Sequence, residues 1–270
     1  MQDLTIVALA RSAGARDTLK AAYPSIQVTH GSLDDTSLIA TEAAKADVVL
    51  NLADADHVAA SKALVCGVKR RRLEGKTSHL IHVSGAGMLM FEDIDKNVYG
   101  ESSDKIFDDY DNISDVVSSI PDHAFHRDVD KVILDAGEDR YIKTAIVSPP
   151  TIYGIGRGVG NKRSAQIPML AEAILKTGKG FQVGEGRAKW TNVHIFDLSD
   201  LFVSLLRQAL IQDSKATSGA DGYYFAENGE HVSYDSSRNL RTSYTDKPHL
   251  LRSGVMYARK LQILRTRKAF

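Results

Sequence analysis

The stretch that decides the fold runs from residue 142 to residue 154 and reads Ile-Lys-Thr-Ala-Ile-Val-Ser-Pro-Pro-Thr-Ile-Tyr-Gly. Its central run, Thr144–Ser148, is short, apolar and rich in β-branched residues, which indicates a strand. Proline lacks a backbone donor and fixes its own φ, so Pro149 and Pro150 end that strand. The stretch therefore predicts a buried strand that leads into a rigid turn.

Four further apolar runs precede this strand, and helical patterns separate them. Such alternation predicts parallel strands joined by crossover helices rather than hairpins. The expected strands span residues 4–10, 26–30, 47–53 and 79–84. We expect the first of these to be buried and the third to be buried on both faces. The sequence thus predicts a doubly wound α/β fold, with a polar segment over residues 92–122 forming surface loop and short helix.

Composition sets mild bounds on the protein. The chain has 270 residues, 43% of them hydrophobic, and its net charge is zero, so residues 1–231 can form one α/β domain and no polyanion partner is implied. Cys66 is the single cysteine, which excludes an internal disulfide and fits a cytoplasmic location. The apolar run at residues 4–10 is too short to span a membrane, and no cleavage pattern follows it.

Residues 232–270 differ in character from the rest of the chain. They carry nine Lys and Arg against two acidic residues, and they lack a clear apolar stripe before Leu250. An arm that binds nucleic acid or another anionic surface is one interpretation. We favour a divergent, poorly ordered tail without nucleic-acid or membrane partners.

A second informative stretch, residues 190–200, reads Trp-Thr-Asn-Val-His-Ile-Phe-Asp-Leu-Ser-Asp. Together with residues 142–154 it resembles the extended and atypical short-chain dehydrogenase/reductases, the epimerase/dehydratase-like group of the NAD(P)-binding Rossmann superfamily. The resemblance covers residues 4–231. It implies hydride transfer between NAD(P) and a small molecule that is a carbonyl compound, an alcohol or similar to a sugar nucleotide. The substrate would bind in a small substrate-side lobe. Among the cofactors, NADPH is slightly preferred. A homodimer is left open.

The resemblance places cofactor contacts at the carboxyl ends of the strands, where ligands of open α/β sheets bind. The guanidinium of Arg11 can meet a ribose phosphate, although a solvated arginine is equally consistent with the sequence. Residues 31–35, Gly-Ser-Leu-Asp-Asp, resemble the segment with which family members contact the adenine, although Asp35 can instead cap the next helix. The cofactor candidates are Arg11, Ser12, Ser32, Leu33, Ala53, Asp54, Ser84, Pro150, Thr151 and Ile152.

The same resemblance implies catalytic roles at two positions. Ser84 stands where the family keeps the serine that hydrogen-bonds the substrate oxygen, although a strand-end serine can also satisfy backbone groups. The resemblance also implies a Tyr-x-x-x-Lys pair, in which a lysine-assisted tyrosine exchanges a proton with the substrate oxygen. No tyrosine here has a lysine four residues later, and the segment where that pair is expected holds His126. An imidazole can act as general acid or base near neutral pH, so His126 is the substitute candidate, against the alternative of an exposed helical histidine. His123 and His126, at helical i, i+3 spacing, could ligate a metal together with Asp130. No third strong ligand is evident beside the two histidines, so we expect no metal.

Substrate contacts are expected from two segments of the second half. The glycine-rich residues 156–166 resemble a substrate loop, with a flexible loop of no specific role as the alternative. The signature at residues 190–200 adds two more polar or aromatic positions. The substrate candidates are Asn161, Arg163, Gln166, Trp190 and Asn192.

One departure from the family pattern affects the whole fold. Relatives begin with a strand and a glycine-rich turn that holds the pyrophosphate, and neither precedes residues 4–10, which match the second strand of that pattern. The missing strand is central in the order 3-2-1-4-5-6, so we expect the sheet to be cut in two, with partial closure of the gap. A non-catalytic NAD(P) sensor of the NmrA type, or an inactive truncated isoform, is the competing interpretation.

Overall fold

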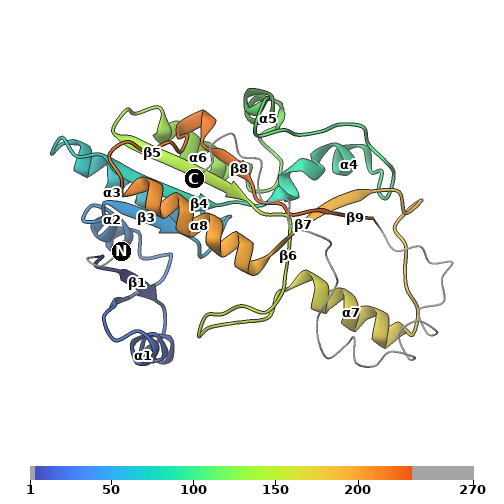
Figure 1. The fold of residues 1–270 in the computed structure, drawn as a ribbon, viewed down its shortest axis with the longest axis horizontal. Helices are drawn as coiled ribbons and strands as arrows, with labels where there is room; N and C mark the ends of the chain where they lie inside the picture. The colour runs from blue at the N-terminus through green and yellow to red at the C-terminus, as the bar shows by residue number, and fades with distance from the viewer. Residues whose placement is uncertain (1–3, 233–270) are drawn as a thin grey trace.

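The computed structural model of the protein describes residues 4–232, which form an α/β fold with three sheets (Figure 1). The strands are β1 (Val7–Ala10), β2 (Gln27–His30), β3 (Val48–Asn51), β4 (Ser78–Val83), β5 (Ile142–Ser148), β6 (Thr151–Tyr153), β7 (Lys189–His194), β8 (Tyr223–Phe225) and β9 (Glu230–Val232). The helices are α1 (Ala13–Ala22), α2 (Thr36–Ala43), α3 (Val58–Arg72), α4 (Phe91–Lys96), α5 (Ile113–Ser119), α6 (Arg127–Gly137), α7 (Gln166–Thr177) and α8 (Ile195–Ala209). The expected strands are therefore confirmed, with bounds that differ by up to three residues.

The main sheet is parallel throughout and has the order β3-β4-β5-β8. Successive residues of its strands point to opposite faces, so Leu80 and Ile146 pack against α3 and α6, while Ile81 and Val147 pack against α8. Figure 1 shows α8 in front of the sheet and α6 behind it. Helices on both faces of a parallel sheet confirm the predicted doubly wound class.

The sheet is divided where the sequence predicts the division. Strands β1 and β2 pair with each other in a separate two-stranded sheet, and among residues 4–232 no ladder joins β1 to β3. The expected partial closure of the gap is wrong. Helix α2 packs so closely on α3 that a Cβ at Gly67 would lie 2.5 Å from the carbonyl oxygen of Ala40. Because α2 also connects β2 to β3, this helix contact ties the β1-β2 sheet to the rest of the fold.

Apolar side chains on either side of this gap are open to solvent. Ile6 is 53% exposed and Leu9 41%, so the expectation of a buried strand at residues 4–10 is wrong. Leu50 is 41% exposed and Leu52 47%, so residues 47–53 are not buried on both faces. Within residues 4–232, no strand pairs with β1 or with β3 on the side where the two sheets are separated.

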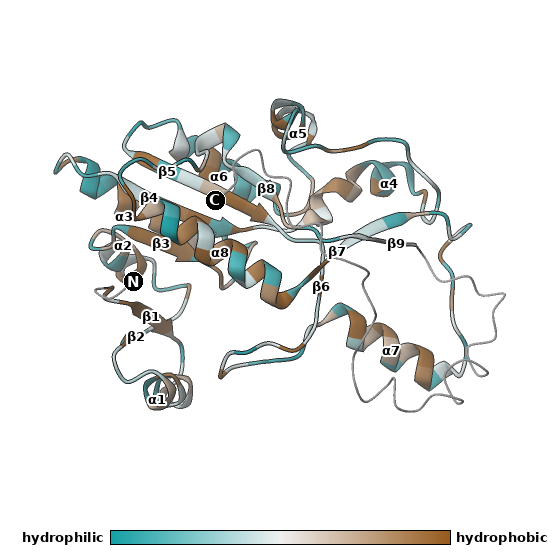
Figure 2. Ribbon diagram, viewed as in Figure 1, coloured by the Kyte–Doolittle hydropathy of each residue, from teal (hydrophilic) through white to brown (hydrophobic). Residues whose placement is uncertain are grey.

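The remaining strands and the long polar segment form the other end of the molecule (Figure 1). Strands β6, β7 and β9 make a mixed sheet, and α7 lies beside it without a buried residue. Hydrophobic residues of α7 are plain in Figure 2. The polar segment contains the short helices α4 and α5 as expected, but it also supplies Val116 and Ile120 to the main core. These two side chains anchor the segment to that core.

Two further predictions concern the basic tail and membrane-spanning segments. The basic tail lies outside the described residues apart from Val232, which ends β9. Within residues 4–232, no helix combines the length and the apolar character that crossing a bilayer requires.

The open gap predicts self-association through its apolar rim. Replacing Leu50 and Leu52 by Lys should reduce aggregation, because unpaired strand edges flanked by apolar side chains promote edge-to-edge pairing. Both side chains are largely exposed, so the free energy of unfolding should change by no more than about 0.5 kcal/mol. Light scattering against concentration measures the effect. Leu73→Lys, at a residue that is 84% exposed beyond the end of α3, is the matched control and should leave aggregation unchanged.

Candidate active site

Three parallel strands bring polar side chains together at one edge of the main sheet. Ser84 follows β4, and its backbone N–H donates to the carbonyl of Val147 on β5 over 2.8 Å. Ser148 ends β5, and Tyr223 begins β8 beside Ile146. Because the short strand β8 pairs only with the last three residues of β5, its first residue Tyr223 lies near the carboxyl edge of the sheet, 139 positions from Ser84 in sequence.

A buried carboxyl group lies at the centre of this cluster. Asp130, on the first turn of α6, is fully buried and accepts hydrogen bonds at Oδ2 from Ser84 Oγ over 2.9 Å and from Tyr223 Oη over 2.7 Å. Ser148 Oγ donates to Tyr223 Oη over 3.1 Å. Burial raises the pKa of Asp130 to about 6, against the lowering effect of the two hydrogen bonds and of the charges on His126 and Arg127. Burial, followed by the charge of Asp130, raises the pKa of Tyr223 well above its usual value.

His82 lies on the inner side of Asp130. Its Nδ1 is 3.0 Å from Asn51 Nδ2, which can only donate, so the hydrogen-bond pattern assigns the ring proton to Nε2. That Nε2 is 3.8 Å from Asp130 Oδ1, too far for a hydrogen bond, and neither atom has a hydrogen-bond partner. Burial, together with the nearby charge of His126, lowers the pKa of His82 to about 4. His82 is therefore neutral near pH 7.

His126 lies against the turn that follows β4. It is the N-cap of α6 with a φ of 64°, and its Nδ1 lies 2.6 Å from Asp56 Oδ1. A Cβ added to Gly85 would be 2.7 Å from His126 Nε2, so the imidazole rests on the backbone directly after Ser84. The side chain is 21% exposed, and the carboxylate of Asp56 orients it. This position differs from the exposed helical surface that was the alternative, and it puts Nε2 next to Ser84.

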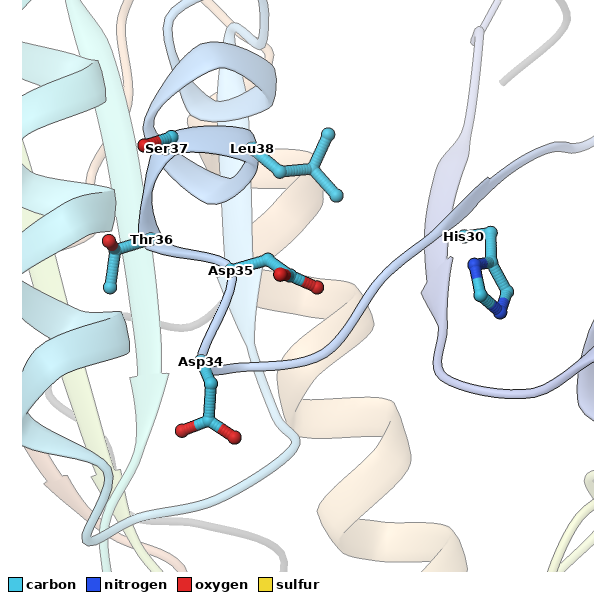
Figure 3. A pocket seen from close by; sticks show the side chains of 6 residues that line it. All are labelled: His30, Asp34, Asp35, Thr36, Ser37 and Leu38. Atoms are coloured by element: carbon cyan, nitrogen blue, oxygen red, sulfur yellow. The ribbon is translucent and has the colours of Figure 1, made fainter.

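The candidates for the adenosine side of the cofactor lie around the separate β1-β2 sheet. Arg11 is exposed, and Ser12 Oγ caps α1 by accepting from Ala15 N over 3.2 Å. Ser32 Oγ accepts from Asp34 N, and Leu33 packs against the contact of α2 with α3. A depression of about 440 Å³ lies next to them, and Figure 3 shows His30 on one side of it and Asp34, Asp35, Thr36, Ser37 and Leu38 on the other.

The candidates at the other strand ends are placed as follows. Ala53 and Asp54 are exposed just beyond β3, on the rim of the gap between the sheets. Pro150 and Thr151 are buried and Ile152 is half-buried, and the carbonyl of Pro149 accepts from Ala86 N over 3.0 Å. The turn after β5 is thereby tied to the turn after β4, which carries Ser84.

The structure brings three substrate candidates together and separates two. Asn161, Arg163 and Gln166 line a depression of about 460 Å³ that Ile152 also lines, and Arg157 and Lys162 add positive charge to it. Trp190 and Asn192 lie on β7 and do not line this depression. The amide of Asn192 donates to the carbonyl of Gly229 over 3.2 Å and so joins β7 to the turn before β9.

The side chains that were considered as metal ligands do not form a cluster. His123 Nε2 binds the carboxylate of Asp95, with 2.9 Å between Nε2 and Oδ1, while His126 binds Asp56. In the part of the chain that the structure describes, no group of three or more His, Cys, Asp or Glu side chains could hold a metal ion.

Sequence reasoning missed most of the buried cluster. Asp130 was considered as a metal ligand, and Tyr223, Ser148, His82 and Asn51 received no role. A signal was present, because His82 lies between the apolar residues Ile81 and Val83 and Ser148 follows the apolar run at residues 145–147, and a buried polar side chain needs a partner.

The buried cluster predicts that removing the hydroxyl of Tyr223 lowers the free energy of unfolding more than removing that of Tyr141. Tyr223→Phe should lower the free energy of unfolding by about 1–3 kcal/mol, because the buried Asp130 loses a donor that nothing replaces. Chemical denaturation measures this change. Tyr141→Phe, which removes a hydroxyl bonded to the exposed Arg140, is the matched control and should cost no more than about 0.5 kcal/mol. Equal losses would contradict the arrangement.

Comparison with known proteins gives these elements a family. The family model described as "NAD dependent epimerase/dehydratase family" matches residues 2–215. A curated relative, "Oxidase ucsJ" from Acremonium sp, is 40% identical over 234 residues, which are 83% of this chain. The chain spans 66% of the length of that relative.

Solved structures confirm the fold at lower identity. A dTDP-glucose 4,6-dehydratase from Streptomyces venezuelae, crystallised with NAD, has a TM-score of 0.55 and 16% identity, over 91% of this chain and 71% of the other. The UDP-glucuronic acid 4-epimerase from Bacillus cereus, in complex with UDP-glucuronic acid and NAD, has a TM-score of 0.52 and 13% identity, over 85% of this chain and 71% of the other. The chain belongs to the NAD-dependent epimerase/dehydratase family.

Proposed function

We propose that the protein transfers hydride between NAD(P) and a small molecule that carries a carbonyl or alcohol group. The observation that supports this most strongly is the position of His126 Nε2, which rests on the backbone of Gly85, the residue that directly follows Ser84. A serine and an imidazole are thus placed at the same turn after β4. Family membership supports the same reaction class.

The residues fit both ends of a dinucleotide. At the adenosine end, the depression between His30 and α2 offers acidic and hydroxyl groups, and Arg11 offers a guanidinium to a ribose phosphate. At the nicotinamide end, Pro150–Ile152 and Ser84 surround the candidate reaction centre. Between them, Ala53 is small and exposed enough to let phosphates pass closely, although the described residues supply no glycine-rich turn there. When bound, the cofactor would supply or accept the hydride.

The chain's own residues would then handle the substrate oxygen. Ser84 holds that oxygen by a hydrogen bond, and His126 exchanges a proton with it through Nε2. Asp56 accepts from Nδ1, which fixes the ring orientation. The pair of His126 with Asp56 therefore takes the part that a lysine-assisted tyrosine plays in the family resemblance.

The depression near β6 favours a substrate that carries negative charge. Lys162 and Arg163 line it, whereas the charge of Arg157 is partly compensated by Asp200 at 3.4 Å. The two solved neighbours are named for the sugar nucleotides dTDP-glucose and UDP-glucuronic acid, which carry phosphates, and the curated relative is named an oxidase. We therefore infer a phosphate-bearing or otherwise anionic alcohol as the substrate class. The cytoplasmic location, the NADPH preference and a homodimer stay predictions.

A second candidate function follows from one sequence observation. No tyrosine of the chain has a lysine four residues later. NmrA-type NAD(P) sensors also lack the catalytic tyrosine of such a pair. A sensor of this kind would bind the cofactor without turning over any substrate. Binding without turnover would therefore favour the sensor, and binding with turnover would favour the enzyme.

Cofactor binding has a direct test in thermal stability. NADPH and NADH should each raise the melting temperature, because a ligand at about one hundred times its Kd stabilises the folded state by about 2.7 kcal/mol. If Arg11 binds a ribose phosphate, Arg11→Ala should weaken NADPH about ten- to a hundredfold and leave NADH unchanged. Arg16→Ala, which removes a guanidinium paired with Asp17 on the same helix, is the control. No shift with either cofactor would refute the proposed function.

The role of His126 is tested by turnover. His126→Ala should lower the rate about 10²- to 10⁴-fold, the usual contribution of general acid–base catalysis, with cofactor affinity retained. The assay follows NAD reduction with dTDP-glucose and UDP-glucuronic acid and NADPH oxidation with simple aldehydes. His123→Ala removes an exposed imidazole three residues away and should leave the rate intact. An unchanged rate in His126→Ala would remove this histidine from the mechanism.

A further inference from the structure

The hydroxyl of Ser84 is already committed to a partner inside the protein. A serine hydroxyl has one proton, and Ser84 donates it to Asp130 Oδ2. With that proton directed inward, Ser84 can offer only lone pairs to a bound molecule. It can accept from an alcohol O–H, but it cannot donate to a carbonyl oxygen.

We propose that Asp130 is a positioning residue whose proton sets the direction of the Ser84 hydroxyl, so that the site holds an alcohol when Asp130 is ionised and a carbonyl when it is protonated. This inference rests on the proposed function. When Oδ2 carries a proton it donates to Ser84 Oγ, and the Ser84 proton is then free to point at the substrate oxygen. The hydrogen bond between the two side chains persists in both states, and its direction reverses.

The surroundings of Asp130 allow it to hold a proton. Its Oδ1 is buried without a hydrogen-bond partner, which is costly for a carboxylate and much less so for the carbonyl oxygen of a neutral acid. Tyr223 still donates to Oδ2 in either state. Burial, which raises the pKa of Asp130 to about 6, acts in the same sense.

The other charged and titratable groups around Asp130 come from several elements. His82 of β4 faces Oδ1, and it is neutral above about pH 4. Tyr223 of β8 keeps its proton because its pKa is raised. His126 and Arg127, on α6 itself and at its start, favour the ionised form of Asp130. None of these groups supplies Oδ1 with a hydrogen bond.

Infrared spectroscopy of the full chain with isotope-labelled aspartate, in the absence of cofactor, tests the inference. A protonated-carboxyl band that Asp130→Asn abolishes should disappear with a midpoint near pH 6. Ser84→Ala removes a donor that favours the ionised form, so the midpoint should rise by about one pH unit. Ser84→Thr retains a hydroxyl and should restore it. Ser148→Ala, which touches Tyr223 but not Asp130, is the matched control and should shift the midpoint by only a few tenths of a unit.

Stability measurements provide a second test that does not need the Ser84 variants. A carboxyl whose pKa is raised on folding stabilises the protein below its unfolded pKa, and this contribution is lost as pH rises through about 6. The melting temperature of the wild type should therefore fall relative to that of Asp130→Asn between about pH 4 and pH 6. His82 has the opposite effect in this window, because its pKa is lowered, and the comparison cancels it since both proteins contain His82.

Two results would overturn the inference. One is the absence of an Asp130 carboxyl band down to pH 4, and the other is an unchanged midpoint in Ser84→Ala. Both are measured without cofactor, so they differ from the result that would refute the proposed function, which is the absence of cofactor binding by the wild type.

Discussion

The pairing of β4 with β5 is the interaction on which the rest of the structure depends. Six residues of each strand are in register, from Ser78 beside Ile142 to Val83 beside Val147. This ladder lies between two others, so β4 has a strand on each side and no open edge. Its side chains separate the two apolar layers under α6 and α8, and its carboxyl end sets the positions of Ser84 and Ser148. The core and the candidate site thus share one scaffold.

The buried polar cluster shows how a core of this kind accommodates a carboxyl group. An isolated buried charge would cost several kcal/mol, and the protein offsets part of this cost with hydroxyl donors from two strands. The compensation is incomplete, because Asp130 Oδ1 and His82 Nε2 face each other at 3.8 Å without a hydrogen bond. Incompletely satisfied groups of this kind occur at functional sites more often than in structural cores.

Local patterns were sufficient to predict β1 to β5, because each is an apolar run that ends in a turn or a helix signal, whereas the short strands β6 to β9 were not predicted. The division of the sheet was predicted from the family resemblance and its strand order. The predictions failed where spacing between elements matters. The close contact of α2 with α3 at Gly67 depends on how the two helices meet, which the sequence does not display. The same limit applies to the cluster. Tyr223 and Asp130 are 93 residues apart, and only the order of strands in the sheet brings them within hydrogen-bond distance.

The division of the sheet also bears on how the molecule opens. Strands β1 and β2 exchange hydrogen bonds only with each other among the described residues, and the contact of α2 with α3 is their chief link to the core. A unit attached in this way can unfold by itself at a small fraction of the global free energy. Its amides should then exchange with solvent deuterium far sooner than those of β4. The proposed adenosine half of the site would fluctuate on its own timescale, and ordering it would weaken cofactor binding by the free energy of that local transition.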